Sequence, residues 1–124
     1  MNNTIWNDEE HKIVITPSGN VDGYKYYFVN VKSNVFSGEY DFCISNETIE
    51  LIISNDLTNL NVEEAILIDD YDSDSFIKFT IADNLGKVIV NGFIGGSHRE
   101  NNMKFEFSAD QTILQNLVNI FKQN

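Results

Sequence analysis

Residues 36–54, FSGEYDFCISNETIELIIS, change from the period of a strand to the period of a helix at Asn46. Before this point, large apolar side chains lie on one face of an extended chain: Phe36, Tyr40, Phe42 and Ile44. Beyond it, they follow helical spacing: Ile49, Ile52, Ile53, Leu57 and Leu60. Asn46 is expected to be the N-cap, and Glu47 and Glu50 favour the positive end of the helix. A strand that runs directly into a helix predicts mixed α and β structure.

Two strands are expected before this stretch. The segment HKIVIT, 11–16, alternates apolar and polar residues, and YKYYFVNVKS, 24–33, places Tyr27, Val29 and Val31 on one face. Asn34 leaves only a tight connection to the strand at 36–45, which predicts a hairpin.

Four strands and a closing helix are expected after the first helix. The strands are VEEAILI (62–68), FIKFTIA (76–82), KVIVNGFIG (87–95) and MKFEFS (103–108). In the final segment Asp110 is the expected N-cap, and one helical face is apolar: Ile113, Leu114, Leu117, Val118 and Phe121. Together these elements predict an α+β fold. We expect an antiparallel, curved meander sheet of about six to seven strands, with one helix after the third strand and a C-terminal helix packed on the sheet.

Composition and charge indicate one folded, acidic domain. The 124 residues are 42% hydrophobic and no linker composition divides them, so a single domain over 1–124 is expected, with an ordered core at about 11–122. Eight Lys and Arg against 19 Asp and Glu give a formal net charge of −11. This charge would repel a phosphate backbone and attract a basic protein, so nucleic acid is not an expected partner.

The single cysteine and the N-terminal sequence predict a cytoplasmic location. Cys43 cannot form an internal disulfide, which fits a reducing compartment. The start MNNTIWNDEEHK has neither the basic nor the apolar region of a signal peptide. No window approaches the roughly 18 apolar residues of a transmembrane helix, so no membrane partner is expected.

The stretch LIDDYDSDS, 67–75, gathers four aspartates without a Lys or Arg: Asp69, Asp70, Asp72 and Asp74. Asp70, Asp72 and Asp74 have the D-x-D-x-D spacing that opens a calcium-binding loop. Such a loop also needs Gly at its sixth position and Glu at its twelfth, where this chain has Ser75 and Ile81. No metal site is therefore expected. A docking surface for a basic partner and a solvated turn both stay open.

Catalytic and cofactor-binding patterns are not found in the sequence. His11 and His98 have no neighbouring Cys and no partner at i+4 spacing, and Gly95-Gly96 matches no phosphate-binding motif. Cys43 is interpreted as a small side chain on one face of a strand. We therefore expect a protein that is not an enzyme and needs no cofactor.

Three stretches resemble a known family when taken in order: FSGEYDFCIS before the first helix, NLGKVIVNGFIGG, and FEFSADQTILQNLVNIF at the C-terminus. In the last, an aromatic-acidic-aromatic strand leads into Asp-Gln-Thr at the start of the closing helix. Its matching residues are Phe105, Glu106, Phe107, Asp110, Gln111, Thr112 and Leu114. The chain resembles the WapI-type immunity proteins, small acidic cytoplasmic proteins encoded beside secreted nuclease toxins. It departs from them in the second strand, where Tyr26, Tyr27 and Phe28 replace an Asn-Trp-Leu start.

The resemblance implies a non-enzymatic immunity protein that neutralises a toxin domain, a nuclease, by direct binding. An acidic inhibitor can cover the basic cleft of a nuclease. In this interpretation Asp69, Asp70, Asp72 and Asp74 supply the electrostatic field and Tyr71 is the aromatic anchor. The alternative is a small-ligand-binding or structural module whose sheet and helices enclose a pocket, with Trp6 and the tyrosines near 24–27 at its mouth. The oligomeric state is not indicated.

Overall fold

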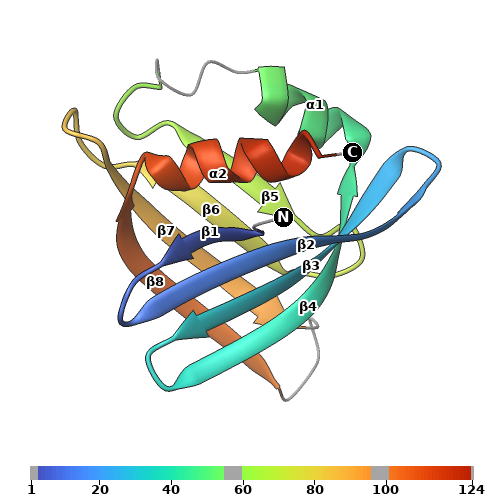
Figure 1. Cartoon of the computed structure of the whole chain (residues 1–124), viewed down its shortest axis with the longest axis horizontal. Coiled ribbons are helices and arrows are strands. Elements are labelled where there is room, and N and C mark those ends of the chain that lie inside the picture. The colour runs from blue at the N-terminus through green and yellow to red at the C-terminus, as the bar shows by residue number, and fades with distance from the viewer. Residues whose placement is uncertain (1–2, 55–59, 96–100, 124) are drawn as a thin grey trace.

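The computed structural model describes residues 3–54, 60–95 and 101–123, which form two helices and eight strands (Figure 1). The helices are α1 (Asn46–Ser54) and α2 (Thr112–Phe121). The strands are β1 (Thr4–Asn7), β2 (His11–Val21), β3 (Tyr24–Ser33), β4 (Phe36–Ser45), β5 (Ala65–Asp69), β6 (Phe76–Ile81), β7 (Lys87–Gly95) and β8 (Asn102–Asp110). The α+β class expected from the sequence is confirmed.

The described strands form two antiparallel sheets of four strands each. The first has the order β1-β2-β3-β4 and the second the order β5-β6-β7-β8, so each sheet is a meander. The prediction of one continuous curved sheet is therefore wrong. The two sheets are separated between β4 and β5, which do not pair with each other. The edge of β4 is instead bonded to the turn that follows β5, because the Cys43 N–H donates to the Asp70 carboxylate.

β1 was not expected from the sequence. It lies before the range 11–122 predicted for the ordered core, yet Ile5 is fully buried and Trp6 packs against the core. The strand is only four residues long and carries too few alternations for a periodic signal. Its position in the sheet comes from antiparallel pairing with β2.

The limits of α1 are tested in part, and those of β5 differ from the prediction. Helical spacing was expected through Leu57 to Leu60; α1 is described to Ser54, residues 55–59 lie outside the described residues, and Leu60 is not helical. The strand expected from residue 62 begins at Ala65, because Glu63 has a φ of 73°, in the left-handed region that a strand excludes. Leu57, Gly96 and His98 lie outside the described residues.

The N-cap of each helix lies one residue from the expected position: Ser45 in place of Asn46 in α1, and Gln111 in place of Asp110 in α2. Ser45, not Asn46, caps α1, since its hydroxyl accepts the Thr48 N–H at 3.2 Å. Asp110 is the last residue of β8, but its carboxylate still accepts the Thr112 N–H at 2.9 Å. β4 and β8 therefore each end on a residue whose side chain accepts a backbone N–H at the start of the following helix.

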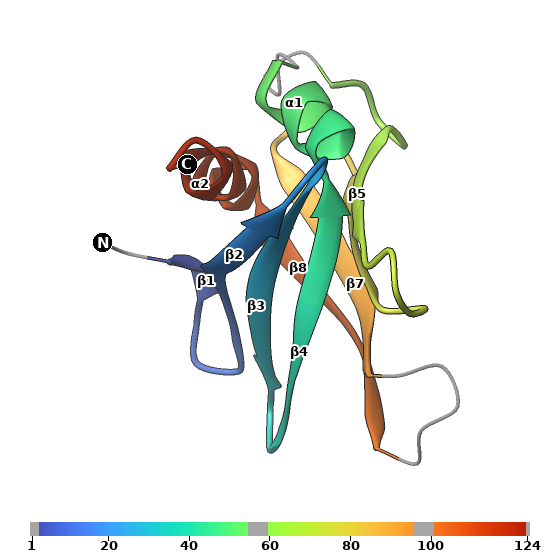
Figure 2. The ribbon, with the colours of Figure 1, turned by 90° about the vertical axis from the view of Figure 1, so that its right-hand side faces the viewer.

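The inner faces of both sheets and both helices share one hydrophobic core. Figure 2 shows the two sheets as separate layers, with α1 and α2 at the same end. Tyr27 of the first sheet, Phe79 of the second and Phe121 of α2 are fully buried, and the Tyr27 and Phe121 rings lie 5.1 Å apart. Asn116 of α2 also donates a hydrogen bond to the Ile5 carbonyl at 3.1 Å. The closing helix thus packs on both the core and β1.

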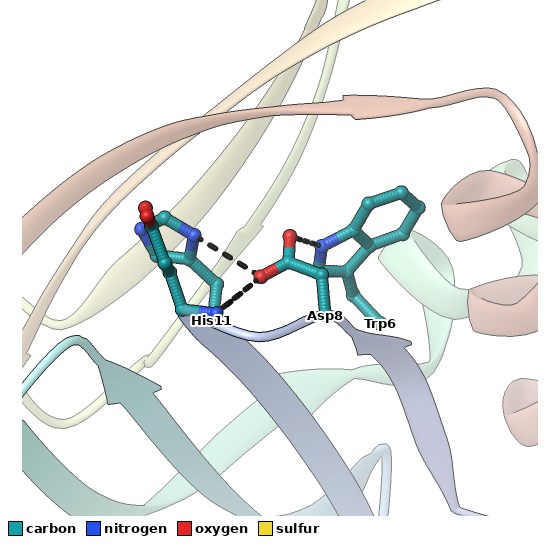
Figure 3. A network of polar contacts seen from close by, with 4 residues as sticks. Trp6, Asp8 and His11 are labelled. Carbon is teal, nitrogen blue, oxygen red and sulfur yellow. Dashed lines mark hydrogen bonds and ion pairs between the residues drawn. The ribbon is translucent and has the colours of Figure 1, made fainter.

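A polar network holds the turn between β1 and β2 (Figure 3). The Asp8 carboxylate accepts the Trp6 indole N–H at 2.7 Å and the backbone N–H groups of Glu10 and His11 at 2.7 and 2.8 Å. The His11 ring stacks on Phe107 of β8, with centroids 4.4 Å apart and an interplanar angle of 12°. The network therefore orders β1 and places His11 against the second sheet.

The Asp8 network predicts a pH-dependent stability. Burial acts to raise the pKa of Asp8, but the hydrogen bonds from Trp6, Glu10 and His11 outweigh it and lower this pKa below its ordinary value. A carboxyl group with a lower pKa in the folded state stabilises the fold above its unfolded pKa, and this contribution is lost as pH falls through the folded pKa. We expect Asp8→Asn to be less stable than the unmodified protein at neutral pH. Urea titrations should show the difference shrinking from about pH 5 to about pH 2; a constant difference would contradict the assignment.

Gly92 lies in the middle of β7, opposite Ile77 of β6 and Phe105 of β8. Neither register shifts at this position, so the glycine marks a close approach and not a bulge. A Cβ at Gly92 would lie 2.6 Å from Phe105 Cζ and 2.6 Å from the Phe76 carbonyl oxygen. The backbone carbonyl cannot move aside without disturbing the pairing of β6 and β7.

We predict that Gly92→Ala lowers the free energy of unfolding by about 1–3 kcal/mol, because the added methyl group overpacks the sheet. The matched control is Gly19→Ala in β2, where nothing lies within 4 Å of an added Cβ. The control should change stability by about 0.5 kcal/mol or less. Urea denaturation of both variants measures the difference, and equal stabilities would show that the second sheet adjusts at no cost.

Candidate partner-binding site

The five residues predicted to bind a partner all lie in residues 69–75, the end of β5 and its connection to β6, here called the aspartate loop. They are Asp69, Asp70, Tyr71, Asp72 and Asp74. The loop is closed at its base by a hydrogen bond from the Asp70 N–H to the Ser75 carbonyl at 2.9 Å. Its side chains do not form one cluster. Asp70 points into the interior, Tyr71 and Asp72 lie beside the first sheet, and Asp69 and Asp74 lie on the second sheet.

Asp70 is an internal residue of the aspartate loop, only 4% exposed. One carboxylate oxygen accepts the Cys43 N–H at 2.9 Å and the Asp72 N–H at 3.2 Å, and the other accepts the Ser73 hydroxyl at 2.6 Å. The Tyr71 N–H donates to the Cys43 carbonyl at 2.9 Å. The prediction that Asp70 faces a partner does not agree with this burial. Asp70 joins the second sheet to β4 and positions the loop.

Tyr71 is the exposed aromatic residue of the loop, with 71% of its surface accessible. Its ring lies against Tyr24 of β3, with centroids 5.0 Å apart and an interplanar angle of 48°. Burial, followed by the charge and hydrogen bond of Tyr71, raises the pKa of Tyr24, so this hydroxyl stays neutral at physiological pH. Tyr71 is thus held on one side and open to a partner on the other.

The outer surface of the first sheet continues from Tyr71 as a row of aromatic and aliphatic side chains. On β3 the buried residues alternate with Tyr24, Tyr26 and Phe28, which face outward beside β4. Phe28 is 40% exposed, and Val21 of β2, which pairs with Tyr24, is 60% exposed. We call Val21, Tyr24, Tyr26, Phe28 and Tyr71 the aromatic face. Tyr27, grouped with its neighbours in the sequence analysis, belongs to the core.

Two exposed carboxylates border the aromatic face. Asp41 pairs with Phe28 across β3 and β4, and its carboxylate accepts the Ser18 hydroxyl at 2.9 Å. Asp72 lies close enough to Tyr24 and Tyr26 to act on both hydroxyls through its charge. An apolar centre with a charged rim is a common arrangement at protein interfaces.

Cys43 is packed beneath the aromatic face and does not have the surroundings of a nucleophile. Its side chain is 4% exposed. Burial raises the pKa of its thiol, a hydrogen bond with Tyr26 opposes this effect, and the charges of Asp72 and Asp70 raise the pKa further. A thiol in such surroundings stays protonated near neutral pH, where the thiolate would be required for attack.

Asp69 and Asp74 belong to a different surface, the outer face of the second sheet. Both line a hollow of about 470 Å³ that also includes Lys78. An adjoining hollow of about 770 Å³ contains Asp74, Lys104 and Glu106. Lysines therefore alternate with carboxylates here, and the local charge is mixed. Within 3–54, 60–95 and 101–123, no three His, Cys, Asp or Glu side chains come together as metal ligands.

Val21, Phe28 and Asp41 were not predicted from the sequence as members of the candidate site. A signal for Phe28 was present, since residues 24–31 carry large side chains at both alternating sets of positions. A strand with one solvated face should show polar residues in one set. Aromatic residues in both sets indicate a second apolar face.

Comparisons with known proteins give no relative for this chain. Neither a protein-family model, nor a curated protein, nor a solved structure matches it. The structure also contains no described helix that is both long and apolar enough to cross a membrane. The resemblance to the WapI-type immunity proteins thus stays a prediction.

We predict that Asp70→Ala lowers the free energy of unfolding by about 2–4 kcal/mol, because it leaves the Cys43 and Asp72 N–H groups without their acceptor. The matched control is Asp69→Ala, an exposed carboxylate one residue earlier, which should cost about 0.5 kcal/mol or less. Urea denaturation measures both. If the two substitutions cost the same, Asp70 does not join the sheets.

Proposed function

We propose that this chain is a non-enzymatic, cytoplasmic immunity protein that binds and neutralises a cognate toxin domain, a nuclease. The observation that carries the proposal is the placement of Tyr71. Its side chain is 71% exposed, yet its loop is anchored through the buried Asp70 and its own N–H is bonded to β4. An exposed aromatic side chain on a fixed backbone loses little conformational freedom on binding, which favours affinity.

The aromatic face would supply the binding energy in this proposal. Burial of exposed aromatic rings at the centre of an interface accounts for most of the affinity in many complexes. Tyr71 and Phe28 present the apolar surface, while Asp41 and Asp72 at the rim would meet cations of the partner. Asp70 would not touch the partner but would hold Tyr71 in place.

Net charge would supply the rate and the selectivity. The formal charge of −11 attracts a basic nuclease domain at long range, and the effect weakens as salt rises. Asp69 and Asp74 would add to this field from the second sheet without touching the same partner surface. Neutralisation would follow from covering a cleft that otherwise receives phosphates, and no catalytic step is required.

A small-ligand-binding module is the alternative proposal, and one observation favours it. The hollow of about 770 Å³ is lined by Phe76, Phe93, Lys104 and Glu106, which combine apolar and charged groups. It lies outside the sheets, whereas the pocket expected from the sequence lay between sheet and helices. That inner space is occupied by core side chains such as Phe42 and Phe79. A substitution at Lys104 should therefore impair a small-ligand-binding module but leave the binding of a toxin domain unchanged.

The first test is co-expression with the C-terminal domain of any large secreted protein encoded immediately upstream, followed by pull-down and by survival of the cells. Co-purification together with rescue supports the immunity proposal. A neighbouring domain that neither binds nor harms the cells would count against it and would favour the alternative.

With a toxin domain identified, Tyr71→Ala should weaken binding by about 30-fold or more, as expected for the loss of a central aromatic contact. The control is Leu85→Ala at the turn before β7, a residue that is 94% exposed and should change affinity little. Lys104→Ala should likewise have no effect. Calorimetric titration of the purified variants measures all three. Equal affinities for Tyr71→Ala and Leu85→Ala would show that the aromatic face is not the interface.

A further inference from the structure

β4 is the last strand of the first sheet, and among the described strands β3 alone pairs with it. It pairs with β3 from Phe36 to Ser45 without a register shift. The N–H and carbonyl of Cys43 point away from β3, because they bond Asp70 and Tyr71 of the aspartate loop. Backbone groups alternate in direction along an antiparallel strand. Those of Asp41, Glu39 and Ser37 therefore point to the same outer edge as those of Cys43.

The hydrogen bonds from the aspartate loop to this edge, among the residues that the structure describes, are made at Cys43. Among the described residues, no strand lies on the outer side of β4 from Ser37 to Asp41. We call these five residues the β4 edge. They carry a row of backbone donors and acceptors in the extended conformation, which is the surface that an added strand recognises.

The two sides of the β4 edge differ in chemistry. On the outer side, Glu39 and Asp41 are exposed carboxylates. On the inner side, a hollow of about 560 Å³ reaches from Tyr40 to Ile94 of β7 and Met103 of β8. A strand placed here would have one set of side chains beside carboxylates and the other set above a hollow in which Tyr40, Ile94 and Met103 lie together with the polar Asn101 and Asn102.

We propose that the β4 edge receives an extended segment of the toxin domain as a fifth strand of the first sheet, antiparallel to β4. Its outward side chains would be lysine or arginine beside Glu39 and Asp41, and its inward side chains would be apolar. This inference rests on the proposed function and gives the partner a mode of binding. Asp41 belongs to the β4 edge and also borders the aromatic face, so one basic partner would contact the two surfaces together.

The geometry specifies which backbone groups of the added strand form the new hydrogen bonds. Residues that face each other across an antiparallel pair lie on the same side of the sheet. Partner residues opposite Glu39 and Asp41 would direct both their N–H and carbonyl groups at β4, and their side chains would be the basic ones. Apolar residues of the segment would direct their backbone groups away from β4.

The probe is a synthetic peptide of alternating lysine and valine, acetyl-KVKVKVK-amide, added to the isotope-labelled full chain at up to about 1 mM, a range that detects weak binding. Amide shifts should concentrate at the β4 edge, and the N–H groups of Glu39 and Asp41 should exchange more slowly with solvent.

Two methylated peptides with identical side chains serve as controls. Methylation of the lysine backbone nitrogens should weaken binding by about tenfold or more, because it removes donors aimed at β4. Methylation of the valine nitrogens should leave binding nearly unchanged.

Substitutions in the protein test the same hydrogen bonds from the other side. Glu39→Pro removes an N–H that does not bond β3, whereas Glu39→Gln removes the charge and keeps the N–H. The proline variant should lose the peptide and the glutamine variant should keep part of the affinity. Glu39→Gln also shows what the charge alone contributes. If the proline variant fails to fold, the methylated peptides still decide the question on the unmodified chain.

Equal binding by both methylated peptides would overturn the strand mode, because attraction to the acidic surface alone would then explain it. Absence of any shift at the β4 edge would also overturn it. With a toxin domain in hand, neutralisation by Glu39→Pro as complete as by Glu39→Gln would refute the added strand and leave the immunity proposal intact. The opposite pattern, peptide pairing at β4 with no toxin bound or neutralised, would refute the immunity proposal and the toxin as occupant, while showing that the β4 edge accepts a basic strand.

Discussion

The structure depends on one buried carboxylate that joins the two sheets. Asp70 accepts the Cys43 N–H at 2.9 Å across 27 residues of sequence, and the same loop returns a backbone bond from Tyr71. Elsewhere β4 meets the second sheet through side chains such as Met103, which lies under Gly38. A buried carboxylate is costly without partners, so its hydrogen bonds fix the loop to one position. That position decides where Tyr71 is exposed and how much of β4 stays open.

Much of the secondary structure could be predicted from the sequence, and the arrangement of the sheets could not. The strands at 24–33, 36–45 and 87–95 have the predicted limits because alternation over nine or ten residues is a strong signal. Alternation identifies the buried face of a strand but not its neighbour. Whether β5 pairs with β4 is decided by the Asp70 contact, which no local pattern contains. The single predicted sheet failed for this reason.

The candidate site divides in the same way. Tyr71 is exposed, as a binding residue must be, and its setting beside Tyr24 follows from sheet geometry that the sequence does not give. Asp70 could not be distinguished from its neighbours, because an aspartate within an acidic run is usually solvated. Only the packing of the loop on β4 shows that one of the four is internal. The exposed aromatic residues of β3 were recognisable in principle, since both of its alternating sets carry large side chains.

The charge on the β4 edge also limits what can pair with it. An open edge strand invites pairing with another copy of the same chain, and proteins often oppose this with charged side chains. A second copy paired antiparallel through β4 would bring Glu39 and Asp41 of the two molecules onto the same face, where like charges oppose each other. The same carboxylates favour a strand that carries lysine or arginine. The carboxylates would thus select a basic strand over a second copy of the chain, while the backbone groups of the β4 edge would form the hydrogen bonds. The aromatic face beside the edge would add the apolar contact that a charged edge lacks.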